Sequence, residues 1–209
     1  MLRLFSIIVL ALSFQQGEIA LAYEEPNYEV IETYPDFELR QYEPYVVAET
    51  LVAGEFSDVG NQAFRRLFAY ISEEERPQGK IAMTTPVIQQ PASQVAVSNG
   101  EDPDSGPMKS YRFAFVMPEA YTLESLPLPA NTAVTLRQVP AKLMAVRRYS
   151  GTWSQKRYRQ NEKQLLDAIS KQGLEQAGEP LFARYNAPFS LWFLRRNEVL
   201  VEIRPRGNR

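Results

Sequence analysis

The tripeptide Leu39-Arg40-Gln41 occurs again 97 residues later as Leu136-Arg137-Gln138. At the same spacing three more pairs are identical and a fourth is aromatic in both copies: Ala48 and Ala145, Gly54 and Gly151, Ser57 and Ser154, Phe56 and Trp153. The match runs without a gap from residue 39 to residue 57. We interpret it as an internal duplication, with copies at about residues 28–118 and 130–205, so the same structural elements are expected in each.

Both copies show the same order of hydrophobic patterns. Alternating or β-branched apolar runs predict strands, and they occur at residues 37–39, 45–52 and 111–117 of the first copy and at 134–136, 143–146 and 200–204 of the second. A helical pattern separates the strands of each copy. The order is therefore strand, strand, helix, strand, strand, given twice.

The two predicted helices have different signals. In the first, expected over residues 58–75, the apolar residues at positions 64, 67, 68 and 71 form one stripe along a helix. The second is expected over residues 154–172, with Ser154 as its N-cap and Gly173 as its C-cap.

Two such units most economically share one sheet that carries both helices, which predicts an α+β fold. Residues 89–110 are rich in Gln, Ser, Gly, Asp and Pro, and we interpret them as a loop between two strands. Thr85-Pro86-Val87 and Ala187-Pro188-Phe189 follow the two helices at similar places. Their spacing is 102 rather than 97, which predicts about five inserted residues after the second helix.

The composition excludes several classes of site. The 209 residues are 44% hydrophobic and 23% charged, which suits a folded domain. They include neither Cys nor His. This chain alone therefore supplies no disulfide, thiolate metal site, Ser-His-Asp triad or His-ligated haem.

Residues 1–22 resemble a secretory signal peptide. Arg3 provides a short positive region, an apolar stretch follows over residues 4–14, and Ala20-Leu21-Ala22 gives a small-x-small cleavage pattern. We expect an exported chain, periplasmic or secreted, whose mature part is one domain over residues 23–209. An uncleaved anchor or an N-terminal helix is the alternative.

Charge is unevenly distributed along the mature chain. Residues 23–136 contain 7 Lys or Arg against 18 Asp or Glu, whereas residues 137–209 contain 15 against 6. The basic residues are scattered, so we interpret the imbalance as attraction between two halves of one domain. Membrane-surface contact through the basic half is an alternative. Overall acidity and the export signal disfavour nucleic-acid binding, and no spacing of carboxylates supports a metal site.

The stretch Lys80-Ile81-Ala82-Met83-Thr84-Thr85-Pro86-Val87 resembles the most recognisable signature of the SOUL/haem-binding-protein family. Four further stretches agree with the family in the same order: Phe37-Glu38-Leu39-Arg40, Phe115-Val116-Met117-Pro118, Tyr185-Asn186-Ala187-Pro188 and Arg195-Arg196-Asn197-Glu198-Val199. The resemblance implies a duplicated βαββ unit that forms a distorted β-barrel or curved sheet with two flanking helices. It also implies binding of a tetrapyrrole, haem or another porphyrin, as in some members of the family. We expect a binding protein rather than an enzyme.

The resemblance places a haem groove beside the first helix and the loop before the C-terminal strand. An apolar macrocycle with two propionates needs apolar walls and cations, and candidate residues of both kinds are present: Phe64, Arg65, Arg66, Phe68, Ile71 and Trp192. Core packing is the alternative for the apolar residues, and a solvated face is the alternative for the arginines. Because His is absent, axial ligation is left to Tyr, Met or Lys, or is lacking. Met83 and Met117 lie in the family motifs and are thioethers, but core packing is the favoured interpretation of both, because Met fills irregular gaps.

Two other functions remain open. One is a carrier of a different amphipathic small molecule. The other is a hydrolase-like enzyme that uses a pocket carboxylate, for which Glu38 and Glu43 would be an acid and base pair. A large apolar groove beside the first helix favours binding, and a small pocket converging on Glu38 or Glu43 favours catalysis.

Overall fold

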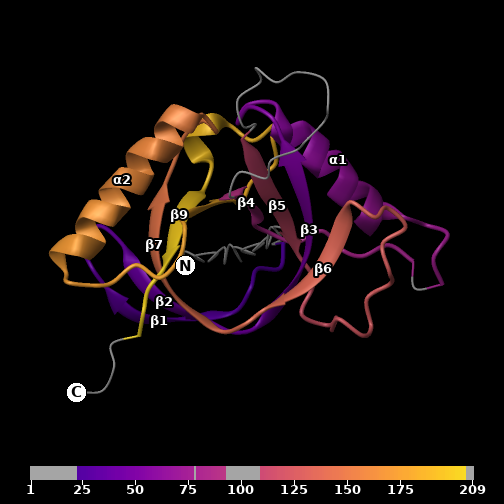
Figure 1. Ribbon diagram of the computed structural model, residues 1–209, viewed down its shortest axis with the longest axis horizontal. Coiled ribbons are helices and arrows are strands. Elements are labelled where there is room, and N and C mark those ends of the chain that lie inside the picture. The colour runs from indigo at the N-terminus through magenta and orange to yellow at the C-terminus, as the bar shows by residue number, and fades with distance from the viewer. Residues whose placement is uncertain (1–22, 78, 93–108, 206–209) are drawn as a thin grey trace, which may run out of the picture.

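The computed structural model describes residues 23–77, 79–92 and 109–205, which form one curled antiparallel sheet with two helices on its outer side (Figure 1). The nine strands of this described part are β1 (Tyr28–Thr33), β2 (Glu38–Tyr42), β3 (Tyr45–Ala53), β4 (Val87–Ala92), β5 (Ser110–Val116), β6 (Val134–Val139), β7 (Lys142–Tyr149), β8 (Leu181–Arg184) and β9 (Asn197–Glu202). The helices are α1 (Val59–Ser72), α2 (Gln155–Lys171) and the short 3-10 helix η1 (Trp192–Leu194). The α+β fold with a curved sheet and two flanking helices is confirmed. The expected signal peptide, residues 1–22, lies outside the described residues, as does most of the expected loop at 89–110.

The strand order repeats the duplication. It runs β1-β2-β7-β9-β8-β4-β5-β3-β6. Across the two copies, β2 corresponds to β6, β3 to β7, β4 to β8 and β5 to β9. If β1 is left out and each strand is replaced by its counterpart, the order is the same when it is read from the other end. The register repeats as well, because Glu38 pairs with Val146, and Glu49 pairs with Thr135 at the same offset of 97. The sheet therefore has approximate two-fold symmetry about the boundary between β4 and β8.

The connection that follows each helix differs from expectation. Pro86 stands directly before β4, but Pro188 lies beyond the end of β8. The proline directly before β8 is Pro180, so Pro188 is not the counterpart of Pro86. Residues 172–180 join α2 to β8, whereas residues 73–86 join α1 to β4. The second connection is thus the shorter one, and the expected insertion is wrong. Pro86 and Pro180 stand directly before their strands, where the backbone N–H is not needed for strand pairing. Pro188 is a further proline beyond β8, so its spacing from Pro86 does not measure an insertion.

Both helices lie close to their expected positions. Ser154 caps α2, because its side chain accepts a hydrogen bond from the backbone N–H of Arg157 at 3.3 Å. Gly173, just past the last turn, has a φ of +63°, which favours glycine. α1 is shorter than expected and ends at Ser72, since Glu73 takes an extended conformation.

Side chains along β4 and β5 alternate between the two faces of the sheet. Phe113 and Phe115 belong to the main core, between the sheet and the helices. Ala114, between them, belongs to a small cluster on the inner, concave face. The helices therefore cover the convex face, and the concave face carries only smaller apolar clusters.

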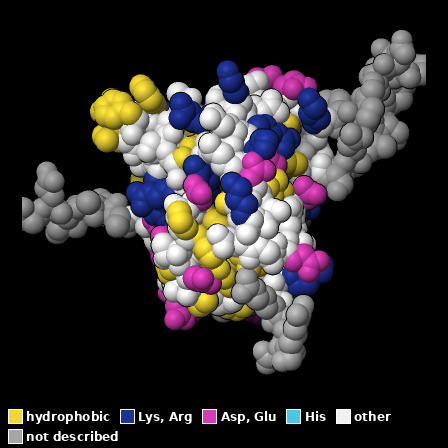
Figure 2. Space-filling model, turned by 90° about the vertical axis from the view of Figure 1, so that its left-hand side faces the viewer, with side chains coloured by type: hydrophobic (Ala, Val, Ile, Leu, Met, Phe, Trp, Pro, Cys, Tyr) yellow, Lys and Arg dark blue, Asp and Glu magenta, His cyan; other side chains and the backbone are white. Residues whose placement is uncertain are grey.

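Acidic and basic parts of the chain meet within the fold. Three ion pairs join a carboxylate of the first half to an arginine of the second: Glu49 with Arg137 at 2.9 Å, Asp36 with Arg147 at 3.3 Å, and Glu25 with Arg196 at 2.8 Å. Figure 2 shows Lys, Arg, Asp and Glu side chains interspersed over one face. These contacts support the interpretation that the two halves attract each other. None of the helices in the described part is long and apolar enough to cross a membrane.

Candidate functional site

An apolar groove of about 670 Å³ lies between α1, the strands β4 and β5, and the segment that follows β8. We call it the α1 groove. Its principal lining residues are Phe64, Leu67, Phe68, Met83, Val87, Phe113, Phe115, Trp153, Arg184, Tyr185, Pro188, Phe189 and Arg195. The volume falls within the range of about 300–1,000 Å³ that small-molecule sites occupy.

Two aromatic rings of α1 form one wall of the groove. Phe64 and Phe68 are one helical turn apart, and their rings stack with centroids 5.6 Å apart and planes 12° from parallel. Phe115 of β5 meets the edge of Phe64, with ring centroids 5.5 Å apart. Phe64 is 37% exposed and Phe68 is 46% exposed. The helix thus presents a flat apolar surface that burial under a ligand would stabilise.

The charged side chains that line the groove are two arginines, Arg184 and Arg195. Both guanidinium groups lie over Trp153, with their carbons 5.1 Å and 4.4 Å from the ring centroid. Arg195 also donates hydrogen bonds to the backbone oxygens of Ser190 and Pro188, at 2.9 Å and 2.6 Å, which fixes the segment after β8. Neither arginine forms an ion pair with a carboxylate of the described residues. The groove is therefore apolar and positively charged.

Arg184 makes fewer hydrogen bonds than Arg195. Its Nη2 donates to the side-chain oxygen of Gln89. Its Nε is shielded from solvent and has no hydrogen-bond partner among the described residues. Burial lowers the pKa of Arg184 to about 10, because the charged form loses hydration that no carboxylate replaces. The side chain stays protonated at neutral pH. An anion bound in the groove would therefore contact a guanidinium that has no carboxylate partner among the described residues.

The structure brings two of the six residues proposed from the sequence into the groove, Phe64 and Phe68. The other four lie outside its lining. Ile71 is 3% exposed and packs in the core, and Arg66 donates to the backbone oxygen of Leu51 at 3.1 Å. Arg65 is exposed on α1. Trp192 is exposed in η1, where its ring meets Phe193 edge to face.

The cations that do line the groove were missed from the sequence, although both adjoin motifs. Arg184 immediately precedes Tyr185-Asn186-Ala187-Pro188, and Arg195 begins Arg195-Arg196-Asn197-Glu198-Val199. Of the two methionines considered as ligands, Met83 lines the groove and Met117 is buried in the core.

The carboxylates considered for catalysis do not converge on the groove. Glu38 pairs with Arg40 at 2.7 Å at the start of β2. Glu43 follows the end of β2 and lines a separate, polar pocket that includes Glu24 and Glu119. Within the described residues, no group of three or more acidic side chains is placed to hold a metal ion.

Solved structures resemble this fold at low sequence identity. The EcmrR C-terminal domain superposes with a TM-score of 0.60 at 9% identity, covering 85% of this chain and 98% of that one. A hydrolase encoded by lin2189 from Listeria innocua gives 0.57 at 12%, covering 81% and 92%. SAV2435 bound to tetraphenylphosphonium gives 0.51 at 8%, covering 81% and 94%. These likenesses extend to the fold alone.

Comparison with curated proteins gives no match. The family model described as SOUL heme-binding protein matches residues 23–202, which is most of the chain. That match agrees with the motifs quoted from the sequence and with the duplicated, curled sheet. The chain belongs to the SOUL haem-binding protein family.

Proposed function

We propose that this protein binds a tetrapyrrole, haem or a metal-free porphyrin, in the α1 groove and acts as a carrier rather than an enzyme. The observation that carries the proposal is the unpaired Arg184 at an apolar groove of about 670 Å³. Family membership supports tetrapyrrole binding in general. A porphyrin combines a flat apolar ring with anionic propionates, and the groove offers a partner for each part.

The groove's residues fit the two parts of such a ligand. Phe64 and Phe68 would cover one face of the ring, and Arg184 and Arg195 would pair with propionates through their planar forks. Met83 is a thioether in the lining, and the chain has no His. A bound haem would supply an iron centre, for which the lining offers the thioether of Met83 and the phenols of Tyr23 and Tyr185 but no imidazole. Affinity would then depend mainly on apolar burial and charge.

A titration with hemin and with protoporphyrin tests the proposal. We expect saturable binding of both, followed by the Soret band, because the groove's contacts do not require the iron. Arg184→Gln should weaken both by about tenfold, since it removes a charge-assisted hydrogen bond. Arg65→Gln is the matched control, because Arg65 is exposed on α1 outside the groove. Met83→Ala should change hemin affinity little.

Circular dichroism verifies that each variant is folded. Absence of saturable binding of either porphyrin would overturn the ligand assignment. Equal losses in Arg184→Gln and Arg65→Gln would overturn the assignment to the α1 groove.

A carrier of another flat, apolar anion is the second candidate, because ring stacking and two cations are not specific to porphyrins. A lipophilic cation such as the tetraphenylphosphonium bound to SAV2435 suits this groove poorly. Its charge would face Arg184 and Arg195 without a carboxylate to compensate.

We further propose that the chain is exported and cleaved after Ala22. Tyr23 would become the first residue, and Tyr23 lines the α1 groove. Its new ammonium group would add a third cation beside the two arginines. N-terminal sequencing of exported protein should begin at Tyr23, and a mature chain that retains residues 4–14 would contradict the proposal.

A further inference from the structure

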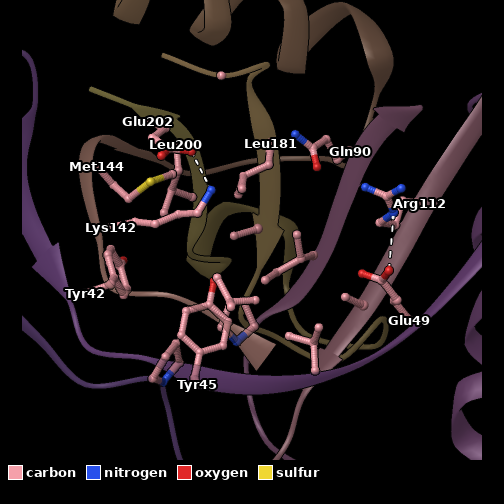
Figure 3. Close-up of a pocket in the computed structure, with 18 of the residues that line it drawn as sticks. Tyr42, Tyr45, Glu49, Gln90, Arg112, Lys142, Met144, Leu181, Leu200 and Glu202 are labelled. Atoms are coloured by element: carbon pink, nitrogen blue, oxygen red, sulfur yellow. Dashed lines mark hydrogen bonds and ion pairs between the residues drawn. The ribbon is translucent and has the colours of Figure 1, made fainter. Parts of the chain in front are cut away.

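A second pocket lies on the concave face of the same sheet, away from the helices (Figure 3). We call it the concave pocket. Its volume of about 110 Å³ is comparable to the roughly 150 Å³ of an engineered cavity that holds one benzene ring. Its apolar lining includes Met144, Leu181 and Leu200. The size suits one ring or a short chain, and it is far too small for a tetrapyrrole.

Charged groups stand at opposite ends of the concave pocket, as Figure 3 shows. Lys142 pairs with Glu202 at one end. At the other end Arg137 donates two hydrogen bonds to one oxygen of Glu49, at 3.1 Å and 2.9 Å. Each of these carboxylates therefore has its own cation. The remaining lining carboxylate, Glu179, is exposed.

Arg112 is the second cation beside Glu49, which already accepts two hydrogen bonds from Arg137. Its Nε is 3.6 Å from Glu49, beyond hydrogen-bond distance, and its guanidinium donates no hydrogen bond to the described residues. The side chain is 45% exposed. Its register partner across the strand pair is Gln90, whose side-chain amide also lies at this end of the pocket (Figure 3). The Gln90 amide already donates to the backbone oxygen of Glu179 at 3.2 Å. The planar guanidinium of Arg112, with unused donors, is the group suited to a carboxylate.

Tyr45 adds a neutral polar group between the two ends. Its ring rises from β3 and its hydroxyl points into the pocket (Figure 3). Burial raises the pKa of Tyr45 to about 12, so the hydroxyl remains protonated and can donate. It makes no hydrogen bond with the described residues.

We propose that the concave pocket binds a small amphipathic carboxylate, with the carboxylate on Arg112 and a single ring or short chain against Met144, Leu181 and Leu200. This site is separate from the α1 groove and does not depend on tetrapyrrole binding. The ligand class follows from the unused guanidinium donors of Arg112 at one end and from the volume of the apolar part.

Benzoate, benzyl alcohol and benzylammonium are matched probes, since they share a ring and differ in charge. Methionine methyl NMR separates the sites, because Met144 lines the concave pocket and Met83 lines the α1 groove. We expect benzoate to shift the Met144 signal saturably and leave Met83 in place. Hemin should do the reverse. Benzyl alcohol should bind about tenfold more weakly than benzoate, and benzylammonium more weakly still.

Arg112→Gln should reduce benzoate affinity by about tenfold, and Arg112→Lys should restore part of it. Arg148→Gln is the control, because Arg148 is exposed and lines neither site. No Met144 shift with benzoate overturns the site, and benzylammonium binding as tightly as benzoate overturns the ligand class. Equal effects of Arg112→Gln and Arg148→Gln overturn the role of Arg112. None of the benzoate, benzyl alcohol and benzylammonium results depends on whether hemin binds.

Discussion

The α1 groove and the concave pocket lie on opposite faces of the same strands. Along β5, Phe113 and Phe115 line the groove, whereas Arg112 and Ala114 line the concave pocket. The groove is large and apolar, and its arginines have no carboxylate partner. The concave pocket is small, and most of its charges are paired. Because successive side chains of a strand alternate between faces, one pair of strands can supply two sites of different chemistry.

Tyr185 is where the two regions meet, because it lines both. Its hydroxyl donates to Glu198 at 2.7 Å. Glu198 is fully buried and also pairs with Arg40 at 3.1 Å and Arg196 at 3.0 Å. Burial raises the pKa of Tyr185 well above its ordinary value, so the hydroxyl keeps its proton and the contact persists. This network holds the wall that the two sites share.

Glu198→Gln should therefore have the largest effect and act on both regions. Gln keeps the shape of the side chain but removes its charge. The buried Arg40 then loses its most deeply buried carboxylate partner. We expect a loss of about 3 kcal/mol in the free energy of unfolding, measured in urea. Glu202→Gln, on the same strand but one-third exposed, should cost under about 1 kcal/mol. Similar losses in both variants would contradict the role of the network.

Phe68→Asp should separate the two regions most clearly. It replaces an aromatic wall by an anion that would face the propionates, so hemin affinity should fall by about a hundredfold. Benzoate binding at the concave pocket should not change. Ala69→Asp is the control on the same helix, since Ala69 is exposed and does not line the groove. Loss of benzoate binding in Phe68→Asp would show that the two sites are not independent.

The sequence predicted the duplicated fold well because the repeat, the strand patterns and the helix stripe are local signals. It predicted the aromatic wall of the groove but not the arginines that line it. Phe64 and Phe68 belong to a helical stripe, so their common face follows from spacing. Arg184 comes from a strand distant in sequence, and only the pairing of β8 with β4 brings it to Gln89. Arg65 and Arg66 are adjacent in sequence to the groove residue Phe64, but consecutive residues on a helix point in different directions.

The double variant Arg184→Met with Gln89→Leu tests whether the groove's charge serves binding at the expense of stability. Replacing both polar partners by apolar groups leaves neither one unpaired. We expect unchanged or higher unfolding free energy and about tenfold weaker hemin binding. Thermal denaturation and Soret titration measure the two effects. A clearly less stable double variant with unchanged hemin affinity would mean that Arg184 is structural.

The pH dependence of porphyrin binding gives the smallest effect. The pKa of Arg184 in the free protein is lowered to about 10 by burial. In the folded state the buried Arg184 charge lowers the free energy of unfolding at every pH below about 10. Above pH 10 the folded protein loses this proton before the unfolded chain does, so the loss of stability disappears as pH rises. For binding the sign is opposite, because a propionate on Arg184 stabilises the protonated form and raises its pKa again. In a chain that retains residues 1–22, and so has no α-ammonium group at Tyr23, affinity for protoporphyrin should therefore be constant between about pH 7 and 9.

Above pH 10 the affinity should decline, by at most about tenfold per pH unit for one group. Protoporphyrin is the suitable ligand, since it avoids hydroxide binding to iron. Burial raises the pKa of Tyr185 in the groove and of Tyr149 near Arg184, so these two phenols stay neutral over the range and do not contribute. The Arg184→Met and Gln89→Leu double variant should show no decline across pH 10. A decline of equal size in the double variant would assign the titration to another group and remove Arg184 from the propionate site.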